Sequence, residues 1–214
     1  MILQHCVKRL VWGFTIFVLL LSMNVATTQA ANLQSTTNKW INTAHTASTY
    51  FLEGTPVNLR ADGSVFSGTI ALQSIFWINT AHTASAAFKA GSFVNFRDDG
   101  SVSSGVITQP TEFWINSAYT ASAVFRKDTV VNFREDGSVS SGIIDKSSPF
   151  WTSIDHNSST LFKVGTLVKF REDGSVSSGT IAQETYFWTN KIHSASVLIP
   201  AGTKVDILED GGIR

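Results

Sequence analysis

Five tryptophans recur at a constant interval of 37 residues, at Trp40, Trp77, Trp114, Trp151 and Trp188. The same interval separates five Asp-Gly pairs, of which the first is Asp62-Gly63. No copy carries an insertion relative to another. A fixed period of this length indicates a solenoid, a propeller or a hairpin array, in which successive copies contact one another regularly. The repeat therefore constrains the fold more than any single residue does.

The first thirty residues differ from the rest. Lys8 and Arg9 precede an apolar run of 16 residues at 10–25, and the small residue Ala30 follows a few positions later. This pattern is typical of a secretory signal peptide cleaved near Ala30. The alternative is a retained membrane anchor, but a span needs roughly 20 apolar residues. We expect a signal peptide at 1–30 and export to the periplasm, the cell surface or the medium.

The remaining chain is expected to form a lead-in at 31–39 and one repeat domain at 40–214. The domain divides into the five units 40–76, 77–113, 114–150, 151–187 and 188–214, the last of them truncated. Without residues 1–30 the chain has fourteen Lys and Arg against sixteen Asp and Glu. This balance gives no electrostatic footprint for nucleic acid. No later apolar run is long enough to span a membrane, and the pattern makes no prediction about oligomeric state.

Each unit has the pattern of short strands. Residues 131–134 alternate between apolar and polar side chains, as in a half-buried strand. Asp136-Gly137 follows, and Asp-Gly is a strong hairpin signal. Residues 139–144 are predicted to be the returning strand, and two more strands are predicted at 113–116 and 121–125. The fold class is therefore all-β, with three or four strands in a unit.

Two all-β architectures fit five copies of which the last is truncated. One is an open β-solenoid-like array of hairpins. The other is a five-bladed propeller, in which the N-terminus would supply the strand that the last unit lacks. We favour the open array, because residues 31–39 contain no apolar segment like Gly68-Thr69-Ile70. A unit of 37 residues is also short for a four-stranded blade, which takes about 40–45 residues.

The segment 165–181 reads GTLVKFREDGSVSSGTI. It resembles the β-hairpin repeats of bacterial secreted and envelope proteins, which are similar to MORN and WG repeats. The resemblance covers about half of each unit, and the Trp-containing half has no counterpart in it. It implies an all-β array used for binding or scaffolding, and it brings no catalytic residues.

The tryptophans are the first candidate functional residues. A buried indole removes about 150–250 Å² from water, which a single unit cannot achieve alone. We therefore expect the five indoles to lie in the core between units. In the alternative interpretation they are exposed platforms for a ligand. The neighbouring Asn42, Asn79 and Asn116 would then form a polar strip that suits the hydroxyl groups of a sugar.

Two further columns carry charge or titratable groups. His45, His82, His156 and His193 share one repeat position, which Tyr119 occupies in the third unit. A metal ion needs several such nitrogens within about 2.1 Å, but a linear stack keeps equivalent atoms a whole unit apart. We therefore expect surface or partly buried histidines and no metal or other cofactor. We expect Arg60, Arg97, Arg134 and Arg171 to form a solvated rim, or alternatively a row that recognises an anionic polymer.

No single asymmetric constellation suggests catalysis, because nearly every Asp, Glu and His belongs to a repeated column. The sequence also lacks a nucleophile elbow and a phosphate-binding glycine loop. We expect an exported, non-catalytic module that binds or scaffolds a cell-envelope glycan or a protein surface. The second hypothesis is a structural component that self-associates through exposed strand edges. The third is a hydrolase-type enzyme, for which Asp155 beside His156 is the main irregularity.

Overall fold

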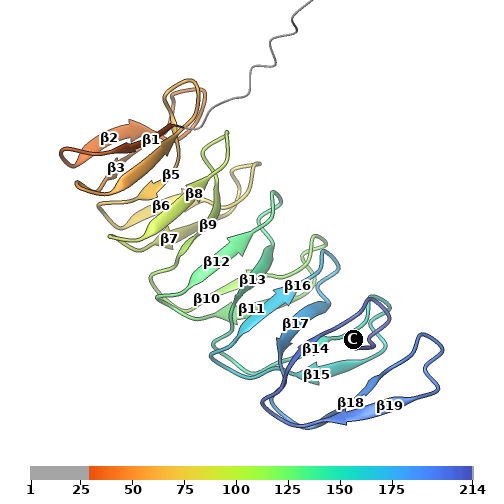
Figure 1. The fold of residues 1–214 in the computed structure, drawn as a ribbon. Coiled ribbons are helices and arrows are strands. Elements are labelled where there is room, and N and C mark those ends of the chain that lie inside the picture. The colour runs from red at the N-terminus through yellow and green to blue at the C-terminus, as the bar shows by residue number, and fades with distance from the viewer. Residues whose placement is uncertain (1–28, 214) are drawn as a thin grey trace, which may run out of the picture.

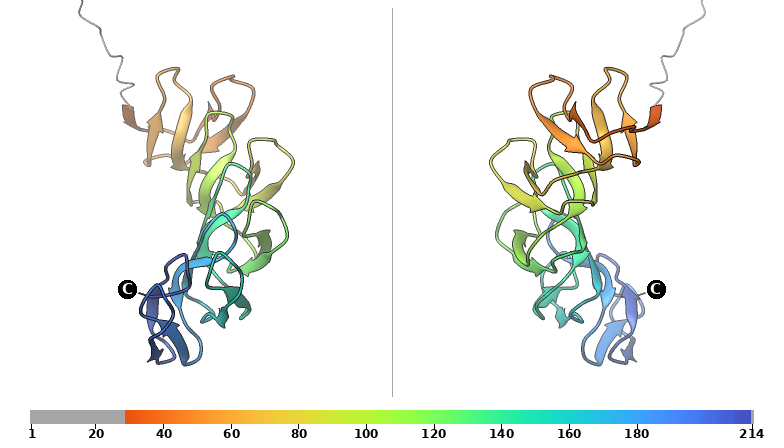
Figure 2. Two further views of the ribbon diagram at one scale, coloured as in Figure 1. Left: turned by 90° about the vertical axis from the view of Figure 1, so that its right-hand side faces the viewer. Right: turned by 90° about the vertical axis from the view of Figure 1, so that its left-hand side faces the viewer.

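The computed structural model describes residues 29–213. The apolar run of the expected signal peptide therefore lies outside the described residues. The described chain is all-β, and its strands are antiparallel (Figure 1). It forms an elongated open array, with β1 at one end and β18 and β19 at the other (Figure 2). The expected hairpin array is confirmed, and the propeller alternative is wrong.

One layer of the array is a single ten-stranded sheet whose strand order follows the chain. Each complete unit contributes two neighbouring strands, joined by a turn that contains Asp-Gly; we call this turn the tip of the unit. The strands are β1 (Gln29–Asn32), β4 (Pro56–Leu59), β5 (Val65–Thr69), β8 (Phe93–Phe96), β9 (Val102–Val106), β12 (Val130–Phe133), β13 (Val139–Ile143), β16 (Leu167–Phe170), β17 (Val176–Thr180) and β20 (Lys204–Asp206).

The second layer consists of five separate two-stranded hairpins, which we call the outer hairpins. A Trp ends the first strand of each of them, and a Ser begins the second. Their strands are β2 (Thr37–Trp40) and β3 (Ser48–Phe51), β6 (Ser74–Trp77) and β7 (Ser85–Phe88), β10 (Thr111–Trp114) and β11 (Ser122–Phe125), β14 (Pro149–Trp151) and β15 (Ser159–Leu161), and β18 (Thr185–Trp188) and β19 (Ser196–Ile199). The strands predicted in the third unit all occur, with ends shifted by one or two residues.

The core lies between the two layers and runs without a break along the array. Phe96 of β8 packs edge-on against Phe51 of the preceding outer hairpin at 6.3 Å, and against Phe76 of its own at 5.1 Å. Phe76 in turn contacts Phe88 at 6.0 Å, and Phe88 contacts Phe133 of the next unit at 6.3 Å. Equivalent contacts continue through Phe133 and Phe170. No unit therefore closes its own core.

Phenylalanine, and not tryptophan, fills this core, so the expectation of buried indoles is wrong. Side chains alternate between the two faces of a strand, and in β6 Phe76 points inward. Its neighbour Trp77 must then point outward and is 45% exposed. The other four indoles are exposed to between 38% and 46%. The fully buried rings are Phe51, Phe88, Phe125 and Phe162.

One glycine of each sheet strand pair makes room for these rings. A Cβ on Gly105 would lie 2.6 Å from Cδ1 of Phe88, which is far inside van der Waals contact. The equivalent glycines at 68, 142 and 179 face Phe51, Phe125 and Phe162 in the same way. The paired columns of Phe and Gly therefore set how closely the two layers approach.

Consecutive units meet where an outer hairpin contacts the tip of the next unit; we call this contact a joint. In the first joint, the backbone N–H of Thr43 donates to the carbonyl of Asp98 at 2.9 Å. Gly100 lies so close to Asn42 that an added Cβ would sit 3.1 Å from the Asn42 Cβ. The same backbone bond recurs in three further joints, at Thr80, Ser117 and Ile154. The array thus contains four equivalent joints.

The N-terminal boundary differs from the expected one. Gln29 and Ala30, assigned to the signal peptide, lie in β1, which pairs with β4. Leu33 of the expected lead-in is buried and follows β1 as Ile70 follows β5. The N-terminal segment therefore does supply a returning strand, but at the end of the array opposite the last unit (Figure 1). Residues 29–213 contain no helix long and apolar enough to cross a membrane.

Candidate functional site

The asparagines of the Trp-containing half are structural. Asn42 is only 5% exposed, and its Oδ1 accepts the backbone N–H groups of Thr46 and Ala47 at 3.0 Å each. Its Nδ2 donates to the Thr46 hydroxyl at 2.7 Å. Asn79 and Asn116 are equally buried and make the same three bonds. The expected polar strip is therefore wrong, because these amides fold their own loop.

The histidine column closes the same loop in the left-handed region of backbone conformation. His45 has a φ of 52°, and His82, His156 and His193 lie within two degrees of it. A non-glycine residue adopts this conformation only at some cost, which the hydrogen-bonded loop offsets. The resulting turn carries the imidazole back over the indole of its own unit. In the third unit Tyr119 has the same backbone conformation, with a φ of 55°.

Each of the four imidazoles stacks on a tryptophan. The ring centroids of Trp40 and His45 are 5.8 Å apart and their planes differ by 10°. The stacks at Trp77, Trp151 and Trp188 have centroid distances of 5.9, 5.4 and 5.2 Å, with planes within 12° of parallel. Trp114 and Tyr119 meet at 63° instead. An aromatic partner thus supports each indole while much of the indole stays open to solvent.

The aspartate of the Asp-Gly turn reaches the same histidine. The His82 Nε2 lies 3.2 Å from Oδ2 of Asp99, and the pair of His156 with Asp173 has the same distance. The other oxygen of Asp99 accepts the backbone N–H and the hydroxyl of Ser101. The expected turn chemistry is therefore present, and the contact with His is additional. In the third unit the Tyr119 hydroxyl donates to the Asp136 carbonyl at 2.7 Å instead.

These hydrogen bonds perturb the aspartate in the first unit. Ser64 donates both its backbone N–H and its hydroxyl to Asp62, and these bonds lower the pKa of the Asp62 carboxyl. The nearby His45 and Arg60 act in the same direction. Residues 29–213 contain no group of three or more His, Cys, Asp and Glu side chains that could hold a metal ion. The Asp62 carboxylate is held by the serine of its own turn and lies beside His45.

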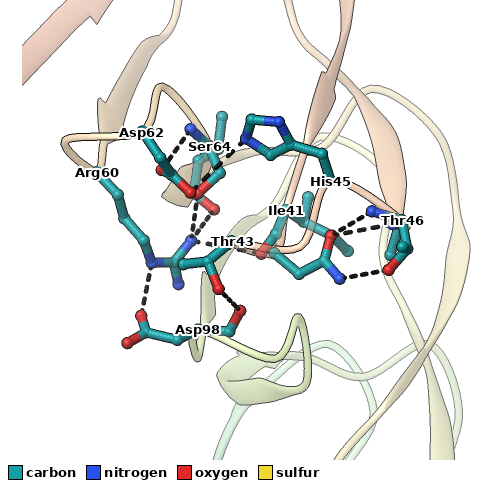
Figure 3. Close-up of polar contacts among 11 residues, drawn as sticks. Ile41, Thr43, His45, Thr46, Arg60, Asp62, Ser64 and Asp98 are labelled. Carbon is teal, nitrogen blue, oxygen red and sulfur yellow. Dashed lines mark hydrogen bonds and ion pairs between the residues drawn. The ribbon is translucent and has the colours of Figure 1, made fainter.

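The arginine column is partly buried, so the expected solvated rim is wrong. The Arg60 Nη1 donates to the Val65 carbonyl at 2.8 Å, and its Nη2 donates to the Phe96 carbonyl of the next unit at 2.8 Å (Figure 3 shows Arg60 beside Asp98). Its Nε bonds Asp98 at 2.7 Å. Burial lowers the pKa of Arg97 and Arg134. Because Arg97, Arg134 and Arg171 make the same two carbonyl bonds, the column holds consecutive units together.

A shallow cleft lies beside the exposed indole in several units. At Trp40 it has a volume of about 290 Å³ and is lined by Asn38, Lys39, Ser48 and Gly63. At Trp114 the equivalent cleft measures about 280 Å³ and is lined by Glu112, Phe113 and Ser122. The cleft at Trp77 is larger, about 380 Å³, because the loop of the preceding unit forms its other wall.

A serine faces each tryptophan across its outer hairpin. Trp40 pairs with Ser48 in the strand register, and Trp114 pairs with Ser122. Sequence reasoning named neither this serine nor the aspartate as part of a site. The signal was present, since both stand at fixed intervals from Trp in every unit. The candidate site is therefore a fivefold row in which each indole is accompanied by a Ser, an Asp and a His or Tyr.

In the first unit His45 lies beside Asp62, and the side chains of Arg60 and Thr43 are directed to Asp98 of the next unit (Figure 3). Comparison of the chain with known protein families, with characterised proteins and with solved structures gives no match. A function for this row therefore rests on its own geometry.

Proposed function

We propose that the protein is an exported, non-catalytic binding module that holds a cell-envelope glycan on its row of tryptophans. The observation that carries this proposal is the repeated, half-exposed indole, supported by an aromatic ring and opening on a cleft. Single exposed apolar side chains are common on protein surfaces. Five equivalent indoles, each held by a stacked or edge-on ring, are a preorganised set.

The chemistry of each cleft suits a sugar ring. An indole offers a flat apolar surface, on which the CH groups of a pyranose can pack. Ser48 lies directly opposite Trp40, and the Asp62 carboxylate stands behind His45 at 3.6 Å. These groups provide a hydroxyl and a titratable pair near the platform. Binding sites generally combine such an apolar surface with a few polar groups that fix orientation.

The periodicity favours a polymer over a single small molecule. Each unit adds two strands to the sheet, so equivalent points near the sheet are about 10 Å apart. One glycan chain could then occupy neighbouring sites, and linked binding events strengthen one another. The same repetition argues against catalysis, since His and Asp recur as pairs in four units instead of forming one constellation.

A glycan array and titrations followed by tryptophan fluorescence test the proposal. We expect polysaccharides to bind, longer oligosaccharides to bind more tightly than short ones, and Trp114→Ala to weaken binding. The matched control is Phe93→Ala, because Phe93 is 44% exposed, close to the 46% of Trp114, but lies on the sheet. Binding that Phe93→Ala weakens as much as Trp114→Ala, or no binding by any glycan, would contradict the proposal.

A further inference from the structure

The last outer hairpin exposes a surface that the other four bury. Val197 of β19 is 39% exposed, whereas the equivalent Thr49, Ala86, Ala123 and Thr160 are at most 7% exposed. Thr189, directly after β18, is also exposed, and its equivalents Ile41, Ile78, Ile115 and Thr152 are buried. In those four units the next outer hairpin and the next tip cover this surface, since Thr160 bonds Thr185 of β18 at 2.8 Å and Gly100 lies against Asn42. No further tip follows the last outer hairpin within residues 29–213.

The opposite end of the array carries the complementary part. Ala30 and Asn32 of β1 pair with Asn58 and Pro56 of β4, as Ser67 and Thr69 of β5 pair with Asn95 and Phe93 of β8. β1 is therefore equivalent to the returning strand β5, and in the sheet it precedes β4 and β5, which form the first complete sheet hairpin. Within the described residues the tip between β4 and β5 contacts its own outer hairpin, through Asp62 and His45, but covers no preceding one. Because the ends lie far apart (Figures 1 and 2), they cannot meet within one chain.

We propose that copies of this chain associate head to tail through a fifth joint of the same design. The tip between β4 and β5 of one copy covers the last outer hairpin of the preceding copy. β1 then extends the preceding sheet beyond β20, the last strand in its order. This inference is independent of the glycan proposal, since none of the five indoles is needed for it.

At the positions that would meet in such a joint, both residues differ from those at the equivalent positions inside the array. In the first joint Arg60 is paired with Asp98, and in the next two Arg97 and Arg134 lie near Glu135 and Glu172. By repeat position, the fifth joint would bring Leu208 of one copy to Ala61 of the next. Arg and acid are thus both replaced by apolar residues. A buried charge without a partner is costly, and this exchange avoids one.

A second pair of positions shows the same correspondence. Inside the array a phenylalanine of each outer hairpin lies against a glycine of the returning strand, as Phe88 lies against Gly105. In the fifth joint these positions hold Ile199 and Ala31 of the next copy. Ile199 is smaller than the phenylalanines of its column, and Ala31 is larger than the glycines of its column, so the two changes in volume offset each other. The two exchanges occur at positions that meet only between copies.

The proposed contact is heterologous, because two different surfaces of the chain meet. Heterologous contacts that do not close produce linear assemblies. An elongated, open array leads to such an assembly, since each added copy leaves a free hairpin at one end and a free tip at the other. The row of tryptophans would continue from copy to copy.

Light scattering and sedimentation over a range of concentrations, with electron microscopy of the same samples, give the first test. We expect concentration-dependent linear oligomers, and we expect Val197→Arg to weaken association by about tenfold or more. The control is Ile75→Arg, since Ile75 is 72% exposed on the second outer hairpin, which takes no part in the proposed joint. A monomer at all concentrations, or equal weakening by both variants, would overturn the proposal.

Charge exchange gives a second test that does not depend on Val197. Leu208→Arg alone and Ala61→Glu alone should each weaken association, because each places one unpaired charge in the joint. The double variant should restore it, since it recreates the Arg and Glu pairs of the internal joints. Far-UV circular dichroism would verify that each variant is folded. Single variants that associate like the parent chain, or a double variant that associates no better than the single ones, would refute head-to-tail contact.

Discussion

In four of the outer hairpins two adjacent aromatic residues, a Phe and a Trp, play different physical parts. The indoles of the Trp column are half exposed, while the phenylalanines beside them form the continuous interior. Sequence reasoning placed the indoles in the core because they are the largest apolar side chains. Adjacent aromatic residues in one strand must point to opposite faces, so only one of Phe76 and Trp77 can be internal. The pattern alone could not decide which, because the choice depends on the layer that the strand faces.

The buried asparagine gives a prediction with an internal control. Asn79→Ala should lower the free energy of unfolding by about 2 kcal/mol, because two buried backbone N–H groups lose their acceptor. Asn190 makes the same three bonds in the last, uncovered outer hairpin. Asn190→Ala should therefore cost less, since water replaces the amide. Urea unfolding measures both, and equal losses would show that burial in the joint is irrelevant.

Acid should remove the contribution of Asp62. Its pKa in the folded protein is below the ordinary value of 3.8, mainly because Ser64 donates two hydrogen bonds to the carboxylate. The charged form is therefore favoured by folding, and its stabilisation is present above pH 3.8 and disappears as the pH falls through the lower folded value. We expect Asp62→Asn to destabilise the protein at pH 7 but to differ little from the parent well below that range. A difference that persists unchanged in acid would contradict this.

At the scale of the elements, much of the repeat could be predicted. The alternation in 131–134 and the Asp-Gly turn located β12, its tip and β13 to within one residue. The division into two layers could not be predicted in this way, because local alternation does not say which strands pair. The returning strand β1 was also missed, since Gln29–Asn32 contains no large apolar residue and was divided between the expected signal peptide at 1–30 and the expected lead-in at 31–39.

The arginine column should be more important for stability than its charge suggests. Arg97→Met should cost about 2–3 kcal/mol, because the guanidinium donates to the Val102 carbonyl and, across the joint, to the Phe133 carbonyl. Arg126→Met is the matched control: its side chain is 45% exposed and pairs with Asp145 at the surface. Such a pair contributes less than about 1 kcal/mol. Chemical unfolding that ranks the two variants in the opposite order would refute the role of the column.

The close contact between Phe and Gly sets the spacing between the layers. Gly105→Ala should destabilise the array by about 1–3 kcal/mol, since the new methyl group would overlap the Phe88 ring. Adding Phe88→Ile should recover part of the loss, because it reproduces the proposed pairing of Ile199 with Ala31. Thermal unfolding of the single and double variants measures the coupling. A double variant that is less stable than the sum of both single losses would argue against this pairing.

At the scale of the whole molecule, the array is open because each unit completes its neighbour and no contact returns from the last unit to the first. The constant period predicted this regularity, and its length of 37 residues favoured an open array over a ring without deciding between them. That distinction depends on where β1 lies, and β1 pairs only with β4 among the described strands. The row of indoles and the free joint surfaces both follow from the open form.

Unfolding of the excised second repeat, cut as residues 74–110 so that strands β6 to β9 are complete, is the most direct test of the claim that the units share one interior. The intact chain covers this repeat on both sides, because Phe51 contacts Phe96 and Phe133 contacts Phe88. Far-UV circular dichroism with increasing urea should show no cooperative transition for the peptide and a single cooperative one for the intact chain. A peptide that is monomeric, compact and cooperatively folded would contradict the claim.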